Sequence, residues 1–148
     1  MKLSLGYPSR EAELEILERQ GEATTPPIDA LGAIVTPQDV AMMTKALASV
    51  HVAPELKGYL LDIAAGTRTH HGLRLGLSPR AILSMQRIAR ALAAASGRSF
   101  VIPDDVKALA RPVLAHRVML SPESQLAGMS AEQIIDDVVA SISVPSIG

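Results

Sequence analysis

The sequence contains no cysteine and no tryptophan, and its aromatic side chains are limited to Tyr7, Tyr59 and Phe100. Without cysteine, neither disulfides nor thiolate zinc sites can form, which agrees with a reducing compartment. With so few aromatic rings, a core has to be built from Leu, Ile, Val, Met and Ala. That composition favours helix packing over a β-sandwich, and it argues against a stacking surface for single-stranded nucleic acid.

The sequence also lacks an excess of charge and a long apolar run. Its 148 residues carry 14 basic and 15 acidic side chains, a formal net charge of −1. This balance gives no electrostatic attraction to nucleic acid or to an anionic membrane. No apolar run approaches the ~20 residues of a membrane helix, and the first residues do not form a signal peptide. We therefore expect a cytoplasmic protein that neither binds nucleic acid nor inserts into a membrane.

Helix signals recur along the chain, which at 48% hydrophobic residues is rich enough to bury a core. Apolar residues at helical spacing repeatedly follow a capping residue or a proline. The pattern predicts an all-α fold, a compact bundle of five to six helices. Pro112 is expected to bend or break the fifth helix before residues 113–116. The expected helices cover approximately residues 9–20, 36–49, 54–68, 79–96, 103–111 and 130–141.

At most one small two-stranded β element is expected beside these helices. Residues 32–35 are short, apolar and β-branched, and residues 117–120 have a similar character. We expect these two segments to pair, with a further brief pairing at residues 100–101. Residues 69–76 are predicted to form a turn, and residues 121–129 a loop.

The stretch Gly76–Ala81, Gly-Leu-Ser-Pro-Arg-Ala, opens the central helix. Ser78 suits the N-cap, and Pro79 suits the first helical position. Arg80 does not fit this logic, because a cation in the first turn opposes the partial positive charge of the helix N-terminus. A bound anion would explain the arginine, since free N–H groups and a guanidinium would converge on it. The simpler interpretation is that Arg80 is solvated or pairs with a carboxylate of a neighbouring helix.

Other patterns for chemistry are weak. The sequence has no glycine-rich phosphate loop ending in Lys-Ser/Thr and no Gly-x-Ser-x-Gly motif. The acid pair Asp104-Asp105 fits a helix start, and Asp136-Asp137 lies within a helix. His70-His71 is the best metal candidate, but it lacks a third ligand at suitable spacing, so no metal site is expected. The arginines at positions 74, 80, 87 and 90 form the only local basic concentration, too small for duplex DNA.

Short motifs are spaced in a fixed order over nearly the whole chain. They are Gly6–Glu11 with Glu13, Ile16 and Leu17, then Thr67-Arg68, Leu75–Ala81, Gly97-Arg98, Pro103–Lys107 and His116-Arg117. In this order they closely resemble the C-terminal part of MoxR-type AAA+ ATPases. The Gly-x-Ser-Pro-Arg-Ala block is the most specific of them, and Gly-Tyr-Pro is moderately specific.

The resemblance implies a fold, domain boundaries and a site. Residues 1–8 would be the junction with a nucleotide-binding core, residues 9–145 the helical lid domain, and residues 146–148 a C-terminal tail. Arg80 resembles the sensor-2 arginine, which reaches the γ-phosphate of ATP and acts catalytically only together with the core. The cofactor-binding residues that the resemblance implies are Tyr7, Pro8, Ser78, Pro79, Arg80 and Ala81.

The resemblance also implies ligands and partners. The parent protein would bind ATP and magnesium and hydrolyse ATP as a chaperone-like machine. Its Walker A lysine, Walker B acids, sensor-1 residue and arginine finger have no counterpart in this sequence. We therefore expect no hydrolysis and no tight nucleotide binding from the lid alone. The implied partners are the AAA+ core, neighbouring subunits of a hexameric ring, and proteins with von Willebrand factor A domains.

Two other functions are compatible with the residues. A helical protein–protein interaction module without a nucleotide role would expose an apolar groove, with residues 34–35 as an edge. A helix-turn-helix DNA binder is disfavoured, because the chain is nearly neutral and has no basic recognition helix.

Overall fold

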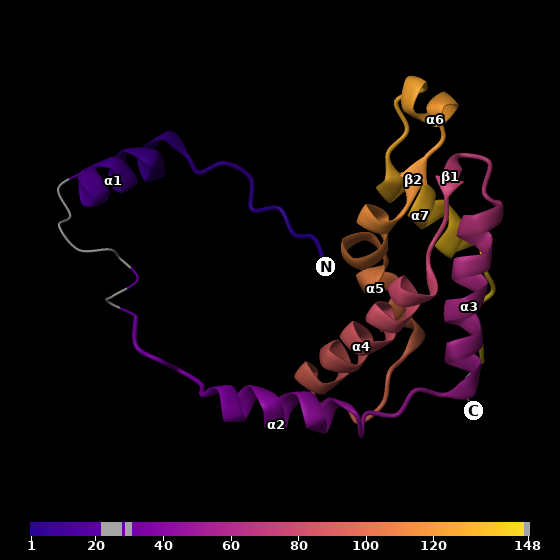
Figure 1. Ribbon diagram of the computed structural model, residues 1–148, viewed down its shortest axis with the longest axis horizontal. Coiled ribbons are helices and arrows are strands. Elements are labelled where there is room, and N and C mark those ends of the chain that lie inside the picture. Colours follow the sequence, from indigo (N-terminus) through magenta and orange to yellow (C-terminus); the bar gives the residue numbers. More distant parts are fainter. Residues whose placement is uncertain (22–27, 29–30, 147–148) are drawn as a thin grey trace. The chain divides into compact units, whose positions relative to one another are not determined.

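The computed structural model describes residues 1–21, 28 and 31–146. The chain divides into two compact units. The smaller unit spans residues 3–42, and the larger comprises residues 1–2 and the chain from residue 43 onward (Figure 1). No helix in the described part of the chain is long and apolar enough to cross a membrane.

The smaller unit contains α1 (Arg10–Gly21) and most of α2 (Pro37–Leu47). Both helices begin where the cap residues predict. The Ser9 hydroxyl accepts a hydrogen bond from the Ala12 N–H at 3.3 Å. The Asp39 carboxylate accepts one from the Thr36 N–H at 2.8 Å, and the Asp39 N–H returns one to the Thr36 hydroxyl. Neither helix has a buried residue within the described chain.

The larger unit is built around a helical core. Its helices are α3 (Pro54–Thr69), α4 (Pro79–Ala95), α5 (Pro103–Leu114), α6 (Pro122–Leu126) and α7 (Ala131–Ser141). The buried hydrophobic side chains are those of Val, Leu, Ile, Ala and one Met apart from Tyr59, which is 2% exposed, whereas Tyr7 and Phe100 are 96% and 50% exposed. The mostly α fold and its aliphatic core are therefore confirmed. The large side chains at the centre are Leu56, Tyr59, Leu60, Ile63, Leu77, Met85, Val106, Val113, Leu114, Ile134 and Ile135.

Two of the predicted helix ends have the expected hydrogen bonds. After α4, Gly97 has φ +73°. The Arg98 N–H donates to the Ala93 carbonyl, and the Gly97 N–H donates to the Ala94 carbonyl. This pair of bonds is the Schellman motif, which favours glycine at the left-handed position. At the start of α7, Ser130 and Gln133 form the predicted capping box.

The β pairing differs from the prediction. β1 (Leu73–Leu75) pairs antiparallel with β2 (Met119–Leu120), with Leu73 opposite Leu120, and the two lie side by side in Figure 1. Residues 31–36 contain no strand, so the expected pairing of residues 32–35 with 117–120 is wrong. β1 takes the place of that partner, and it lies within residues 69–76, which were expected to form only a turn.

Two further local predictions are corrected. The expected loop at residues 121–129 contains α6, whose N-cap Ser121 accepts a hydrogen bond from the Ser124 N–H at 3.3 Å. Of the bend or break expected at Pro112, the break does not occur: α5 continues to Leu114 before a 3₁₀ turn, η2 (Ala115–Arg117). Proline removes one helical hydrogen bond, but Val113 and Leu114 are fully buried and hold the last turn in the core.

The start of α5 is joined to the end of α4 by one ion pair. The two Nη groups of Arg98 donate to the two carboxylate oxygens of Asp105 at 2.9 and 2.6 Å. Asp105 is 5% exposed and also accepts the Ile102 N–H at 2.9 Å. Burial by itself would raise the pKa of Asp105. The hydrogen bonds from Arg98 and Ile102, with the charge of Arg98, outweigh burial and hold the pKa below its usual value.

Asp105→Asn should lower the free energy of unfolding at neutral pH by about 2 kcal/mol, because it breaks a buried charge-assisted pair. A depressed pKa means that this stabilisation is present above the unfolded-state value of about 3.9 and is lost as the pH falls through the folded-state value. Urea unfolding at pH 7 and below pH 4 measures both effects.

The matched control for this experiment is Asp104→Asn. The Asp104 side chain is 79% exposed and only 3.5 Å from Lys107, so its loss should change stability by less than about 0.5 kcal/mol. An Asp105→Asn protein that loses as much stability in acid as the wild type would contradict the assignment.

Candidate functional site

The first turn of α4 has the cap geometry that the sequence predicts. Ser78 is extended, with φ −80° and ψ 160°, and its hydroxyl accepts the Ala81 N–H at 3.3 Å. Pro79 occupies the first helical position, where a missing N–H removes no helical hydrogen bond. Ala81 is fully buried. One side of the turn is therefore packed against the core through Ala81, and Arg80 lies on its exposed side.

Arg80 is exposed at this helix start. Within the described part of the chain, no carboxylate pairs with its guanidinium, whereas Arg19, Arg98 and Arg111 each have an acidic partner. The Arg80 carbonyl accepts a hydrogen bond from the Ser84 hydroxyl at 3.0 Å, a bond that does not involve the Arg80 side chain. Of the two simpler interpretations, pairing with a carboxylate of a neighbouring helix is not met among the described residues, whereas the exposure of Arg80 agrees with a solvated side chain.

The last turn of α3 holds the segment that leads into α4. The Leu77 N–H donates to the Thr67 hydroxyl at 3.0 Å, and the Leu77 carbonyl accepts from Arg68 Nε at 3.0 Å. Thr67 is fully buried, and its own hydroxyl donates to the Ala64 carbonyl at 2.7 Å. Both backbone groups of Leu77 are thus bound by α3. Leu77 lies two positions before Pro79, the first residue of α4.

Gly76 lies against the backbone of α3 at the same place. A Cβ atom on Gly76 would lie 2.7 Å from the Arg68 nitrogen and 2.8 Å from the Thr67 carbonyl carbon. Backbone atoms cannot move aside as the end of a flexible side chain can. Glycine is therefore required here for close approach of two backbones.

The roles of Thr67 and Arg68 were not identified from the sequence, although both belong to a motif of the resemblance. One signal for Thr67 was present. It follows Leu60, Ile63 and Ala64 at helical spacing, which places a polar residue on the buried face of the helix, where it must find hydrogen-bond partners. The role of Arg68 depends on where residue 77 lies in space, and helical spacing carries no information about that.

The other two predicted site residues belong to a different unit from α4. Tyr7 and Pro8 belong to the smaller unit, and Ser78–Ala81 to the larger. Tyr7 is 96% exposed, and the preceding Gly6 has φ +70°. A nucleotide-binding role for Tyr7 and Pro8 stays a prediction.

The rings of His70 and His71 are stacked, with centroids 4.7 Å apart and planes inclined by 17°. The His70 Nδ1 already accepts the Gly72 N–H at 3.0 Å. Imidazole lone pairs lie in the ring planes, so two nearly parallel stacked rings cannot direct them at one ion about 2 Å away. The described residues also contain no group of three or more acidic or histidine side chains placed for a metal.

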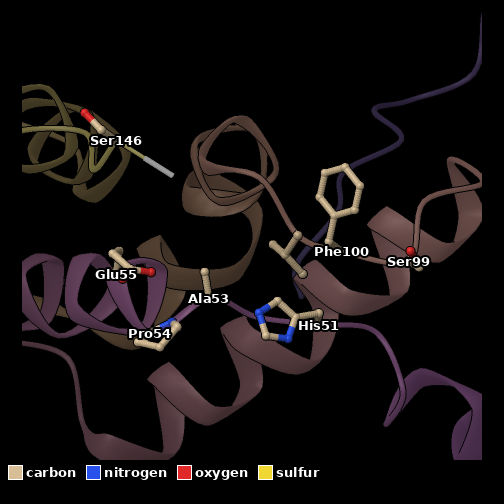
Figure 2. Close-up of a pocket in the computed structure, with 8 residues that line it drawn as sticks. His51, Ala53, Pro54, Glu55, Ser99, Phe100 and Ser146 are labelled. Carbon is tan, nitrogen blue, oxygen red and sulfur yellow. The ribbon is translucent and has the colours of Figure 1, made fainter. Parts of the chain in front are cut away.

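A hollow of about 750 Å³ lies at the start of α3, away from the segment 76–81. It is bounded by the bridge between His51 and Phe100, in which the His51 N–H donates to the Ser99 carbonyl at 2.8 Å. This bridge confirms the brief pairing expected at residues 100–101. Figure 2 shows the Phe100 ring and the His51 imidazole on these neighbouring segments, with Glu55 on α3. The lining is mixed polar and apolar and has no clustered charge of one sign.

Comparison with known proteins identifies the fold around the α4 start. Residues 65–138, half of the chain, match the family model of the AAA lid domain. This range contains the end of α3, the whole segment 76–81, α4 to α6 and most of α7. The chain belongs to the AAA lid domain family.

The relatives of this chain include proteins named MoxR. It is 35% identical over 144 residues to the uncharacterized protein YeaC of Bacillus subtilis, covering 97% of the lid chain and 44% of that protein. It is 32% identical over 155 residues to the chaperone MoxR1 of Mycobacterium tuberculosis, covering 99% and 40%. The chain thus spans less than half the length of these curated relatives.

A solved structure has a similar fold over nearly the whole chain. The crystal structure of a protein from Cytophaga hutchinsonii, named provisionally as an ATPase, matches with a TM-score of 0.83 and 27% identity. The match covers 99% of the lid chain and 46% of that protein. The resemblance to the lid of MoxR-type AAA+ ATPases is therefore confirmed.

Gly76→Ala should lower the free energy of unfolding of the lid by about 1–3 kcal/mol, because its Cβ overlaps the α3 backbone. Gly58→Ala is the matched control. Gly58 lies within α3 with no heavy atom within 4 Å of an added Cβ, so alanine should stabilise the lid by about 0.5–1 kcal/mol. Urea unfolding midpoints measure both, and a Gly76→Ala lid as stable as the wild type would show that the two backbones are not in contact.

Proposed function

We propose that Arg80 is a sensor-2 arginine, which binds the γ-phosphate of ATP when the lid packs beside the nucleotide-binding core of a MoxR-type AAA+ ATPase. The observation that supports this is the exposed guanidinium on the first turn of α4, with no acidic partner among the described residues. In this role the lid contributes to ATP binding and to hydrolysis, and it moves with the nucleotide state of the protein.

The electrostatics of the α4 start suit a polyphosphate. A helix N-terminus carries a partial positive charge, and a guanidinium adds a full charge and a planar fork of N–H donors. Two of these donors can bind two phosphate oxygens at once. In the free lid the positive charge of Arg80 is opposed by the partial positive charge of the helix N-terminus. When a phosphate is bound, both positive charges attract the same anion.

The remaining chemistry belongs to the nucleotide-binding core. The described residues of the lid hold no acidic cluster for Mg²⁺, and the sequence has no phosphate loop. The residues present therefore do not fit a magnesium site, and no step through the metal is assigned to the lid. Arg80 stabilises negative charge on the transferred phosphoryl group, and it neither activates water nor binds the metal.

The family also suggests an assembly. We propose that the parent protein forms a ring, hexameric as in related AAA+ proteins, in the cytoplasm. Its partners would be neighbouring subunits and proteins with von Willebrand factor A domains. The name of the mycobacterial relative, chaperone MoxR1, agrees with a chaperone-like role for the parent.

Arg80→Ala, in a protein that carries this lid with its nucleotide-binding core, should lower ATP turnover roughly tenfold to a hundredfold. Arg80→Lys should be intermediate, because it keeps the charge and loses the fork. Steady-state ATP hydrolysis measures these effects, with thermal unfolding as a check that the lid stays folded.

Arg87→Ala serves as the control for this experiment. Arg87 is exposed on the same helix and has no ion-pair partner among the described residues, so its loss should leave turnover unchanged. Equal turnover of the wild type and Arg80→Ala would remove Arg80 from the mechanism.

A protein-interaction role without nucleotide is the second candidate, and the hollow beside Phe100 is the observation that favours it. Phe100 is 50% exposed, and its ring borders the space in Figure 2. Residues 34–35, once expected to form a strand edge for such a groove, form none. Under this function, Arg80→Ala leaves turnover unchanged.

A further inference from the structure

We infer that Thr67 and Arg68 are positioning residues for Arg80: by binding both backbone groups of Leu77, they fix the direction in which α4 starts. This inference rests on the proposed function of Arg80. Neither residue touches the phosphate in this role, because each acts through the backbone of residue 77.

The two hydrogen bonds act on adjacent peptide planes. The Leu77 N–H, bound by the Thr67 hydroxyl, belongs to the plane before residue 77, and the Leu77 carbonyl, bound by Arg68 Nε, belongs to the plane after it. The Leu77 side chain is 1% exposed and anchors the same residue in the core. With both planes and the side chain held, φ and ψ of Leu77 have little freedom, and the path into Ser78 is set.

The acceptor on Thr67 is itself oriented. Its hydroxyl proton is committed to the Ala64 carbonyl at 2.7 Å, so a lone pair is left for the Leu77 N–H. On the other side, the donor is the Nε of a charged guanidinium, and hydrogen bonds from charged donors are stronger than neutral ones. Thr67 thus supplies a buried, oriented acceptor and Arg68 a charged donor. Both lie in the last turn of α3, and both bind Leu77.

The restraint on Leu77 also limits the backbone position of Arg80, which lies three residues later. Ser78 caps the helix through the Ala81 N–H, and Pro79 has a fixed φ. Arg80 is therefore separated from the bound residue 77 by one capped residue and one proline. Few rotatable backbone bonds remain between the last turn of α3 and the Arg80 Cα atom, so a shift at Thr67 or Arg68 changes the point from which the Arg80 side chain extends.

The test is a double-mutant cycle on ATP turnover in the protein that carries the lid and its core. Thr67→Val keeps the shape of the side chain and removes the hydroxyl. It should lower turnover roughly tenfold when Arg80 is present, because small displacements of catalytic groups are costly. In the Arg80→Ala background it should have an effect below about twofold, since the positioned group is gone.

Rescue and exchange measurements separate positioning from general stability. Thr67→Ser keeps the hydroxyl and should restore turnover to near the wild-type value. Hydrogen exchange at the Leu77 amide should be faster in Thr67→Val and unchanged in Thr67→Ser. Arg68→Lys keeps the charge and loses the Nε donor, so it should lower turnover too, even if Thr67→Val fails to fold. Arg74→Lys, exposed on β1, is its control.

The outcomes distinguish the two levels of the proposal. If Arg80→Ala lowers turnover and Thr67→Val lowers it by the same factor in both backgrounds, the positioning role is overturned and the role of Arg80 stands. If Thr67→Val is unfolded, the decision rests on Arg68→Lys. An Arg68→Lys protein with the same ATP turnover as Thr67→Ser and the wild type likewise overturns the positioning role. If Arg80→Ala has no effect on turnover, the proposed function itself fails.

Discussion

The contact between the last turn of α3 and residues 76–77 determines where α4 begins. Gly76 lets the two backbones meet, and Thr67 and Arg68 satisfy the backbone groups of Leu77. Since α4 also packs against α5, and α5 against α7, an error at this junction would be passed on to the rest of the larger unit. A buried peptide group without a partner costs about 1–3 kcal/mol, so the two hydrogen bonds at Leu77 are a constraint on the fold as well as on the site.

The two ends of α4 use arginine in opposite ways. Arg98, just past the C-terminus, donates to Asp105 and to the Phe100 carbonyl, and these bonds join α4 to α5. Arg80, at the N-terminus, has no acidic partner among the described residues. A cation suits a helix C-terminus and not an N-terminus. The ion pair with Asp105 accounts for Arg98, whereas no described contact accounts for Arg80, and the phosphate that we propose would do so.

The sequence predicted the elements whose signals are local. The cap at Ser78, the glycine stop at Gly97 and the capping box of α7 depend on a few neighbouring residues, and all are present. The strand partner of residues 119–120 was mistaken, because pairing depends on which segments the helices bring together and short apolar runs do not specify it. The α3 contacts of Leu77 were missed for the same reason: they join residues nine and ten positions apart across a turn.

The position of Arg80 has an energetic consequence for the lid. A cation in the first turn costs roughly 0.3–1 kcal/mol, and the Ser78 cap alone contributes about 1 kcal/mol in the opposite direction. The buried Ala81 and Leu77 fix the turn from the core side. The helix start is therefore stable despite its arginine, because its neighbours offset the unfavourable charge. The same neighbours fix the backbone from which the Arg80 side chain extends, and the phosphate-sensor role that we propose makes use of that fixed starting point.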